Sequence, residues 1–150
     1  MRRIYKTAKL LPETEAAIAN ISGSYTWLIL TEAWCGDAAQ NIPVIQRIAD
    51  LSPQVKVQYI LRDTNLDLMD QHLTNGGRGI PKMIVIDDAS GEVVAEWGPR
   101  PAHAQQMVMD YKALEETPPY SEFVKEVQKW YGSDRTVSTQ NELIAMLGKL

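Results

Sequence analysis

The stretch Glu32-Ala33-Trp34-Cys35-Gly36-Asp37-Ala38 joins two segments of opposite character. The residues before it, 25–31, are apolar without alternation, as in a strand covered on both faces of a sheet. After it, over residues 38–51, apolar residues recur at spacings of three and four, as on one face of a helix. The sequence therefore predicts a strand that leads to a cysteine at the start of a helix.

Cys35 in that position is a candidate for thiol chemistry. A helix start presents unpaired backbone N–H groups and a partial positive charge, which stabilise a thiolate and lower its pKa from the ordinary value. Asp37 acts in the opposite direction, because a neighbouring anion disfavours the thiolate. The sequence does not decide which effect wins. Between an inert buried cysteine and an exposed reactive one, the helix start favours the second.

The rest of the chain alternates strands and helices and then becomes helical. Ile4 and Tyr5 fit either a short strand or an arm. The predicted elements are helix 12–21, strand 55–61, short helix 66–73, strands 83–86 and 93–97, and helices 102–116 and 121–131, with a last helix after the capping-box pair Thr139 and Glu142. The short loop 87–91 predicts an antiparallel hairpin. The fold class is α/β, with a mixed sheet of four or five strands flanked by helices.

The composition indicates one domain, with a core over residues 12–116 and a helical C-terminal extension over 117–150. A net charge of −4 without a basic run argues against nucleic acid or a membrane surface as a partner. No segment has the length of a membrane span, so a cytoplasmic protein is expected. The single cysteine excludes an internal disulfide. His72 and His103 lack ligand spacing, so neither a metal nor a cofactor is expected.

A second segment, Arg78-Gly79-Ile80-Pro81, lies just before the third strand. A trans proline there is ordinary, whereas a cis proline would form a tight turn. Because only about 5–6% of X–Pro bonds in folded proteins are cis, the residues alone do not establish either form.

Taken together, these motifs resemble thioredoxins over about residues 20–112. The shared features are Trp34-Cys35-Gly36 after a buried strand, Pro43 inside the next helix, Gly79-Ile80-Pro81 before a strand, a hairpin with Gly91-Glu92-Val93, and Gly98. The resemblance is greatest to a bacterial branch whose motif begins Trp-Cys-Gly-Asp. It implies a thioredoxin-like fold, with Pro81 cis against the cysteine and with the Ile80 backbone pairing with an extended substrate segment.

The chain departs from the family pattern at three positions. Ala38 replaces the second cysteine, Ile29 the buried aspartate that assists it, and Tyr59 the lysine partner. The resemblance therefore implies a single-cysteine redox site that does not reduce insulin disulfides efficiently.

The expected site has Cys35 as its catalytic residue. The residues that shape the site are Trp34, Gly36, Asp37, Ala38, Ile80 and Pro81. Candidate contacts for an anionic substrate such as glutathione are Gly79, Arg78 and Arg100, although such arginines are more often plain surface residues. For Asp37, a helix N-terminal acid contributing about 0.3–1 kcal/mol is favoured over a catalytic role.

Three functions compete. The first is monothiol exchange with a disulfide of a protein or of a low-molecular-weight thiol, in which an outside thiol resolves the intermediate. The second is a peptide-binding or redox-sensing module without disulfide reductase activity. The third, least favoured, is an iron–sulfur cluster shared by two chains, since Cys35 to Ala38 differs from the Cys-Gly-Phe-Ser pattern of known carriers.

Overall fold

The computed structural model describes residues 1–150, and its centre is a four-stranded mixed sheet. The strands are β1 (Tyr25–Thr31), β2 (Val55–Leu61), β3 (Lys82–Asp87) and β4 (Val93–Trp97), in the order β2-β1-β3-β4. β1 pairs in parallel with β2 and antiparallel with β3, and β3 pairs antiparallel with β4. The predicted α/β class and the predicted hairpin are confirmed.

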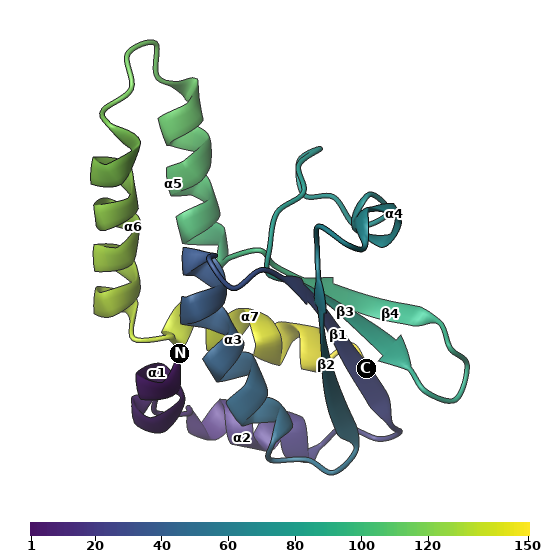
Figure 1. The fold of residues 1–150 in the computed structure, drawn as a ribbon. Helices are drawn as coiled ribbons and strands as arrows, with labels where there is room; N and C mark the ends of the chain where they lie inside the picture. Colours follow the sequence, from purple (N-terminus) through teal and green to yellow (C-terminus); the bar gives the residue numbers. More distant parts are fainter.

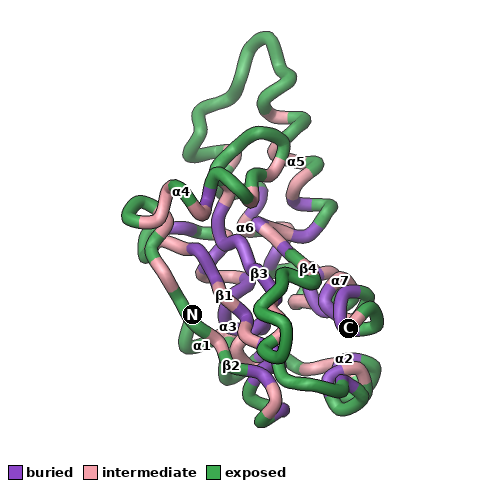
Figure 2. Tube along the Cα trace, turned by 90° about the vertical axis from the view of Figure 1, so that its right-hand side faces the viewer, coloured by how far each residue is buried: buried purple, intermediate pink, exposed green.

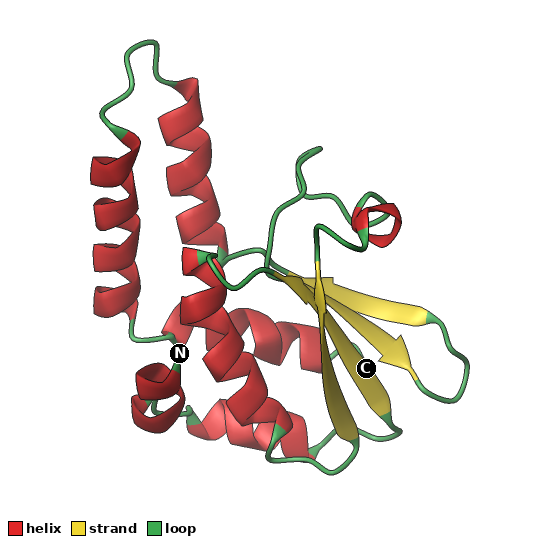
Figure 3. Ribbon diagram, in the orientation of Figure 1, coloured by secondary structure: helices red, strands yellow, loops and turns green.

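Seven helices accompany the sheet (Figure 3). They are α1 (Arg2–Thr7), α2 (Pro12–Ala19), α3 (Gly36–Ala49), α4 (Leu66–Met69), α5 (Ala102–Ala113), α6 (Tyr120–Asp134) and α7 (Val137–Leu147). Helices α1, α2, α3 and α7 gather on one side of the sheet (Figure 1). No helix combines the length and apolarity that a membrane span requires.

The N-terminal segment differs from its prediction. Ile4 and Tyr5 lie in α1, not in a strand, so the sheet has four strands and not five. α1 carries no buried residue and is held to α3 by the hydroxyl of Tyr5, which donates to Asp50 at 2.6 Å.

The core lies between β1, β3 and the helices, where buried residues run through both strands (Figure 2). Trp27 and Ile29 are fully buried, and truncation of Trp27 to alanine would cost about 3–5 kcal/mol. On the opposite face, Leu30 is fully buried but Leu28 only half-buried. The prediction of a strand covered on both faces is therefore only partly right, because the helices gather on one face.

α3 carries the predicted apolar stripe. Ile42, Ile45 and Ile48 are buried along it, each contributing about 1.5–3 kcal/mol of burial free energy. Pro43 lies inside this helix without ending it, and its side chain is buried. The stripe fixes the rotation of α3 and so the direction in which its first turn faces.

The C-terminal part forms a helical hairpin, α5–α6, that projects beyond the sheet, followed by α7 against the core (Figure 1). The predicted capping box is wrong. Thr139 is buried within α7, and Thr136 occupies the N-cap position. Glu142 instead accepts hydrogen bonds from the Trp97 indole at 3.0 Å and the Ala102 N–H at 2.7 Å, so it ties α7 to the start of α5.

Candidate functional site

Cys35 lies where β1 is joined to α3. It is the N-cap residue of α3, and its backbone is extended. Its Sγ atom accepts a hydrogen bond from the Ala38 N–H at 3.5 Å, and its thiol donates to the carbonyl oxygen of Ile80 at 3.3 Å. The sulfur is therefore held between the first turn of α3 and the segment that precedes β3.

The thiol of Cys35 is largely withdrawn from solvent, since the residue is 9% exposed and belongs to the main hydrophobic cluster. Burial raises the pKa of Cys35 above its ordinary value of 9.0, and the charge of Asp37 raises it further. The Ala38 N–H and the Arg100 charge lower this pKa, but the net direction is upward. The expectation of an exposed thiol is therefore wrong. The direction of the pKa, which the sequence left open, is upward because desolvation of the thiolate outweighs the helix start.

The peptide bond between Ile80 and Pro81 is cis, and both residues are buried. Gly98 packs directly on this segment. Its φ is +112°, and a Cβ atom there would lie 2.2 Å from the carbonyl oxygen of Pro81. Both the backbone conformation and the close approach restrict position 98 to glycine. The loop after β4 thus supports the segment that accepts the hydrogen bond from Cys35.

Asp37 lies at the centre of a polar network. Its Oδ2 atom accepts from the Arg100 guanidinium at 2.9 and 3.0 Å, and its Oδ1 from the Tyr131 hydroxyl at 2.6 Å. The amide of Asn41 donates to the Asp37 carbonyl and to the Tyr131 hydroxyl, both at 3.0 Å, and its oxygen accepts from Thr139 at 2.8 Å. Asp37 thereby helps to hold α6 against α3, and Asn41 holds α7.

Tyr131 supplies this network with a permanent donor. Burial raises the pKa of Tyr131, and the charge of Asp37 and the hydrogen bond to it act in the same direction. The hydroxyl therefore stays protonated over the physiological range and donates to the carboxylate. Charge-assisted hydrogen bonds of this kind are about twice as strong as neutral ones.

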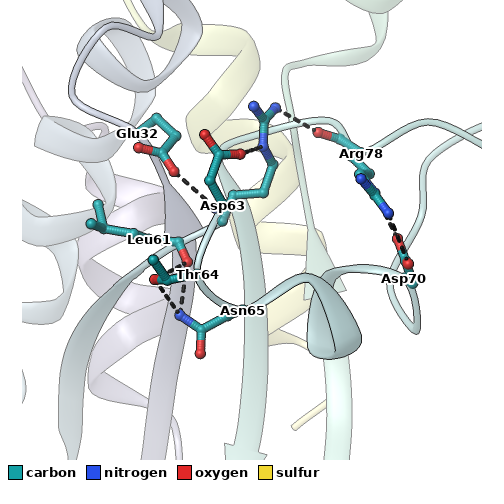
Figure 4. A network of polar contacts seen from close by, with 8 residues as sticks. Glu32, Leu61, Asp63, Thr64, Asn65, Asp70 and Arg78 are labelled. Carbon is teal, nitrogen blue, oxygen red and sulfur yellow. Dashed lines mark hydrogen bonds and ion pairs between the residues drawn. The ribbon is translucent and has the colours of Figure 1, made fainter.

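On the other side of Cys35, the side chain of Trp34 is 68% exposed. The Cζ atom of Arg62 lies over the Trp34 ring, 5.2 Å from the ring centroid. A cation–π contact at an exposed position contributes about 0.5–1 kcal/mol. Arg62 also donates to the Asp63 carboxylate at 2.9 Å and to the Arg78 carbonyl at 3.2 Å. The carboxylate of Glu32 accepts from the Asp63 N–H at 2.9 Å, which adds the end of β1 to this network (Figure 4). The turn after β2 therefore links the cysteine loop to the segment before Pro81.

Both arginines that were candidate substrate contacts are paired with carboxylates. Arg78 donates to Asp70 at 2.8 and 3.1 Å in an exposed ion pair (Figure 4). Arg100 pairs with Asp37 and donates to Gln105 at 2.6 Å. Each arginine would have to exchange a partner to bind an anionic substrate. Gly79 faces Pro99, whose Cγ would lie 2.9 Å from a Cβ atom at position 79.

The sequence pattern did not single out the residues that surround Asp37 and Trp34. Asn41 carries a weak signal, because it lies four positions after Asp37 and so on the same helix face. Tyr131 reaches the site from α6, and no local pattern connects it to Asp37. No local pattern marks Arg62 either, although it contacts both Trp34 and the Arg78 carbonyl.

A cavity of about 440 Å³ opens between α1, α3 and the edge of the sheet, but Cys35 and Pro81 do not line it. Nowhere do three or more His, Cys, Asp or Glu side chains come together as potential metal ligands.

Comparisons with known proteins agree with this fold. The chain is similar in structure to a protein of unknown function from Pseudomonas aeruginosa, with a TM-score of 0.72 and 18% identity over 98% of this chain and 81% of that one. It is also similar to an HIV epitope scaffold, with a TM-score of 0.70 and 17% identity over 99% and 82% of the two chains. At these identities the likeness concerns the fold alone.

Among curated proteins, none matches the sequence. The family model described as thioredoxin matches residues 1–115, which include β1 to β4, Cys35 and Pro81. The chain therefore belongs to the thioredoxin family.

Proposed function

We propose that the protein carries out thiol–disulfide exchange through the single thiol of Cys35. The main support is the position of its Sγ atom, 3.5 Å from the Ala38 N–H at the start of α3 and 3.3 Å from the Ile80 carbonyl beside Pro81. As the thiolate forms, the Ala38 N–H remains as a donor to the sulfur. Membership in the thioredoxin family supports the same chemistry.

The reaction has two exchange steps. The Cys35 thiolate attacks one sulfur of a substrate disulfide, so that a Cys35–substrate disulfide forms and the other sulfur leaves as a thiolate, which takes up a proton. An external thiolate then attacks the mixed disulfide at the substrate sulfur and releases Cys35. The external thiol supplies the electrons and ends in the product disulfide. It has to come from outside because Ala38 stands where a resolving cysteine would lie.

The raised pKa of Cys35 sets the expected rate. At neutral pH most molecules hold the protonated thiol, donating to Ile80, so the first step is slow and its rate rises with pH up to the pKa of Cys35. This exchange site is therefore proposed to differ from a reactive low-pKa cysteine.

The test is reduction of a glutathione mixed disulfide with external glutathione as the second thiol. The expected result is a rate that depends on the glutathione concentration and is lost in Cys35→Ser. A Cys35→Ser variant as active as the native chain would exclude the proposal.

A second candidate is a peptide-binding module, and the same raised pKa of Cys35, with the exposed ring of Trp34 beside it, favours it. In that case peptide binding would be retained in the Cys35→Ala variant. It would be lost when Trp34 is replaced by alanine.

A further inference from the structure

Helix α6 packs on the first turn of α3, directly beside the cysteine. The amide of Gln40 donates to the side-chain oxygen of Gln128 at 2.7 Å. A Cβ atom at Gly36 would lie 3.3 Å from Nε2 of the same glutamine. Because that distance is shorter than most real Cβ contacts, a side chain at position 36 would have to displace Gln128 slightly.

The contact continues along both helices. Tyr131, nearly one turn after Gln128, donates to Asp37 and accepts from Asn41. α6 therefore touches α3 at residues 36, 37, 40 and 41, which face one side of its first two turns. Together these hydrogen bonds fix α6 at the edge of the cysteine site.

The α5–α6 hairpin has its own small core, which packs the two helices against each other. His103 stacks on Trp130 with ring centroids 5.0 Å apart, and Tyr111 stacks on Phe123 at 4.2 Å. The buried residues of this second cluster are Ala104, Val127 and Tyr131. Figure 1 shows the hairpin rising from the start of α3 well beyond the sheet, so it would meet a large partner that approaches the cysteine from that side.

The other sides of Cys35 are also bounded. The Ile80 carbonyl lies 3.3 Å from its sulfur, and the Asp37–Arg100 ion pair follows it along α3. Among its chain neighbours, Ala33, Trp34 and Gly36 are exposed. At 9% exposure, Cys35 offers a substrate disulfide a narrow approach. In such an exchange the three sulfur atoms must also lie in line, which demands room beyond the attacked sulfur.

We propose that the α5–α6 hairpin, seated through Gln128 and Tyr131, restricts Cys35 to low-molecular-weight disulfides and excludes disulfides within folded proteins. This proposal rests on the exchange reaction given above, and it assigns the substrate class to that reaction. Gln128 is the specificity-determining residue in this scheme, because it lies against Gly36, the residue next to Cys35.

The decisive measurement is alkylation of Cys35 with a small reagent, iodoacetamide, and with a maleimide carrying a large polymer. In the folded chain the ratio of the large-reagent rate to the small-reagent rate is expected to be at least about tenfold below that in the urea-unfolded chain. Equal ratios in the two states would overturn the proposal. This readout depends on access alone and needs no exchange activity.

Two variants locate the effect. Gln128→Ala is expected to raise the ratio severalfold towards that of the unfolded chain, whereas Lys129→Ala, an exposed neighbour on the same helix, leaves it unchanged. An unchanged ratio in a folded Gln128→Ala variant would remove Gln128 from the scheme and overturn the proposal.

Exchange rates distinguish the size restriction by the hairpin from the exchange reaction of Cys35 itself. Glutathione disulfide is expected to react faster with Cys35 than a mixed disulfide on a folded protein, and Gln128→Ala is expected to narrow that difference. Faster reaction with the folded protein would overturn the size restriction. If neither substrate reacts while the alkylation ratios hold, the exchange function fails and the restricted access stands.

Discussion

The hydroxyl of Tyr131 donates a hydrogen bond of 2.6 Å to the carboxylate of Asp37, a residue 94 positions earlier in the chain. The same hydroxyl accepts from Asn41, so a side chain from α6 is bonded to two residues in the first turns of α3. The helix that begins at Cys35 is therefore stabilised from outside the segment that the family model covers.

Tyr131→Phe keeps the ring but leaves Asp37 and Asn41 without one partner each. Because both lie within a largely buried network, we expect a loss of about 1–3 kcal/mol in the free energy of unfolding, measured in urea. Tyr120→Phe is the matched control, since Tyr120 is well exposed on the same helix. Equal effects of the two changes would contradict the importance of the Asp37 bond.

The charges of Asp37 and Arg100 are expected to shift the pKa of the Cys35 thiol in opposite directions. Asp37→Asn removes a charge that raises the pKa of Cys35, and Arg100→Met removes one that lowers it. We therefore expect the pKa of Cys35 to fall in the first variant and to rise in the second. The pH dependence of iodoacetamide alkylation measures both. Shifts of the same sign would show that structural rearrangement, and not charge, dominates.

Alkaline pH is expected to remove a stabilising contribution of Cys35. The pKa of its thiol is raised in the folded state above the ordinary value of 9.0, so the contribution is complete below pH 9.0 and is lost as pH rises through the folded value. The measurement is urea unfolding of the native chain and of Cys35→Ala at pH values from neutral to alkaline. The difference between their free energies of unfolding gives the contribution of Cys35. The stability difference between the two should shrink with rising pH. A difference that grows with pH would reverse the assigned direction.

The absence of a resolving cysteine predicts negligible reduction of insulin disulfides. Ala38, whose N–H lies 3.5 Å from the Cys35 sulfur, is the position at which a second thiol would meet the first. We expect Ala38→Cys to form an internal disulfide on oxidation, seen by mass spectrometry as a loss of two hydrogens, and to raise insulin reduction by at least about tenfold. Ala39→Cys is the control, because its side chain leaves the helix in another direction. Robust insulin reduction by the native chain would refute this prediction.

The strands and α3 were predictable because their signals are local. The apolar run at 25–31, the alternation at 55–61 and the short loop at 87–91 each specify one element and its pairing. The boundaries were less accurate: helix 66–73 is the single turn Leu66–Met69, and α5 ends at Ala113 rather than 116.

What the sequence did not reveal depends on distant contacts. Thr139 has the spacing of a cap, yet it lies inside α7, where its hydroxyl donates to Asn41 of α3. The burial of Cys35, which decides the direction of its pKa, involves contact with the distant Ile80, and Asp37 is paired with the equally distant Tyr131. Local patterns carry no information about such partners.

A substitution at Gly98 would alter the hydrogen bonding of Cys35 without replacing any residue that contacts the sulfur. Any side chain at position 98 would collide with the Pro81 carbonyl, and relief of that collision would displace the backbone on which Ile80 presents its oxygen to the thiol. Gly98, 63 positions after the cysteine, therefore controls the hydrogen bond of its thiol. Random mutagenesis should find position 98 among those that tolerate the fewest substitutions.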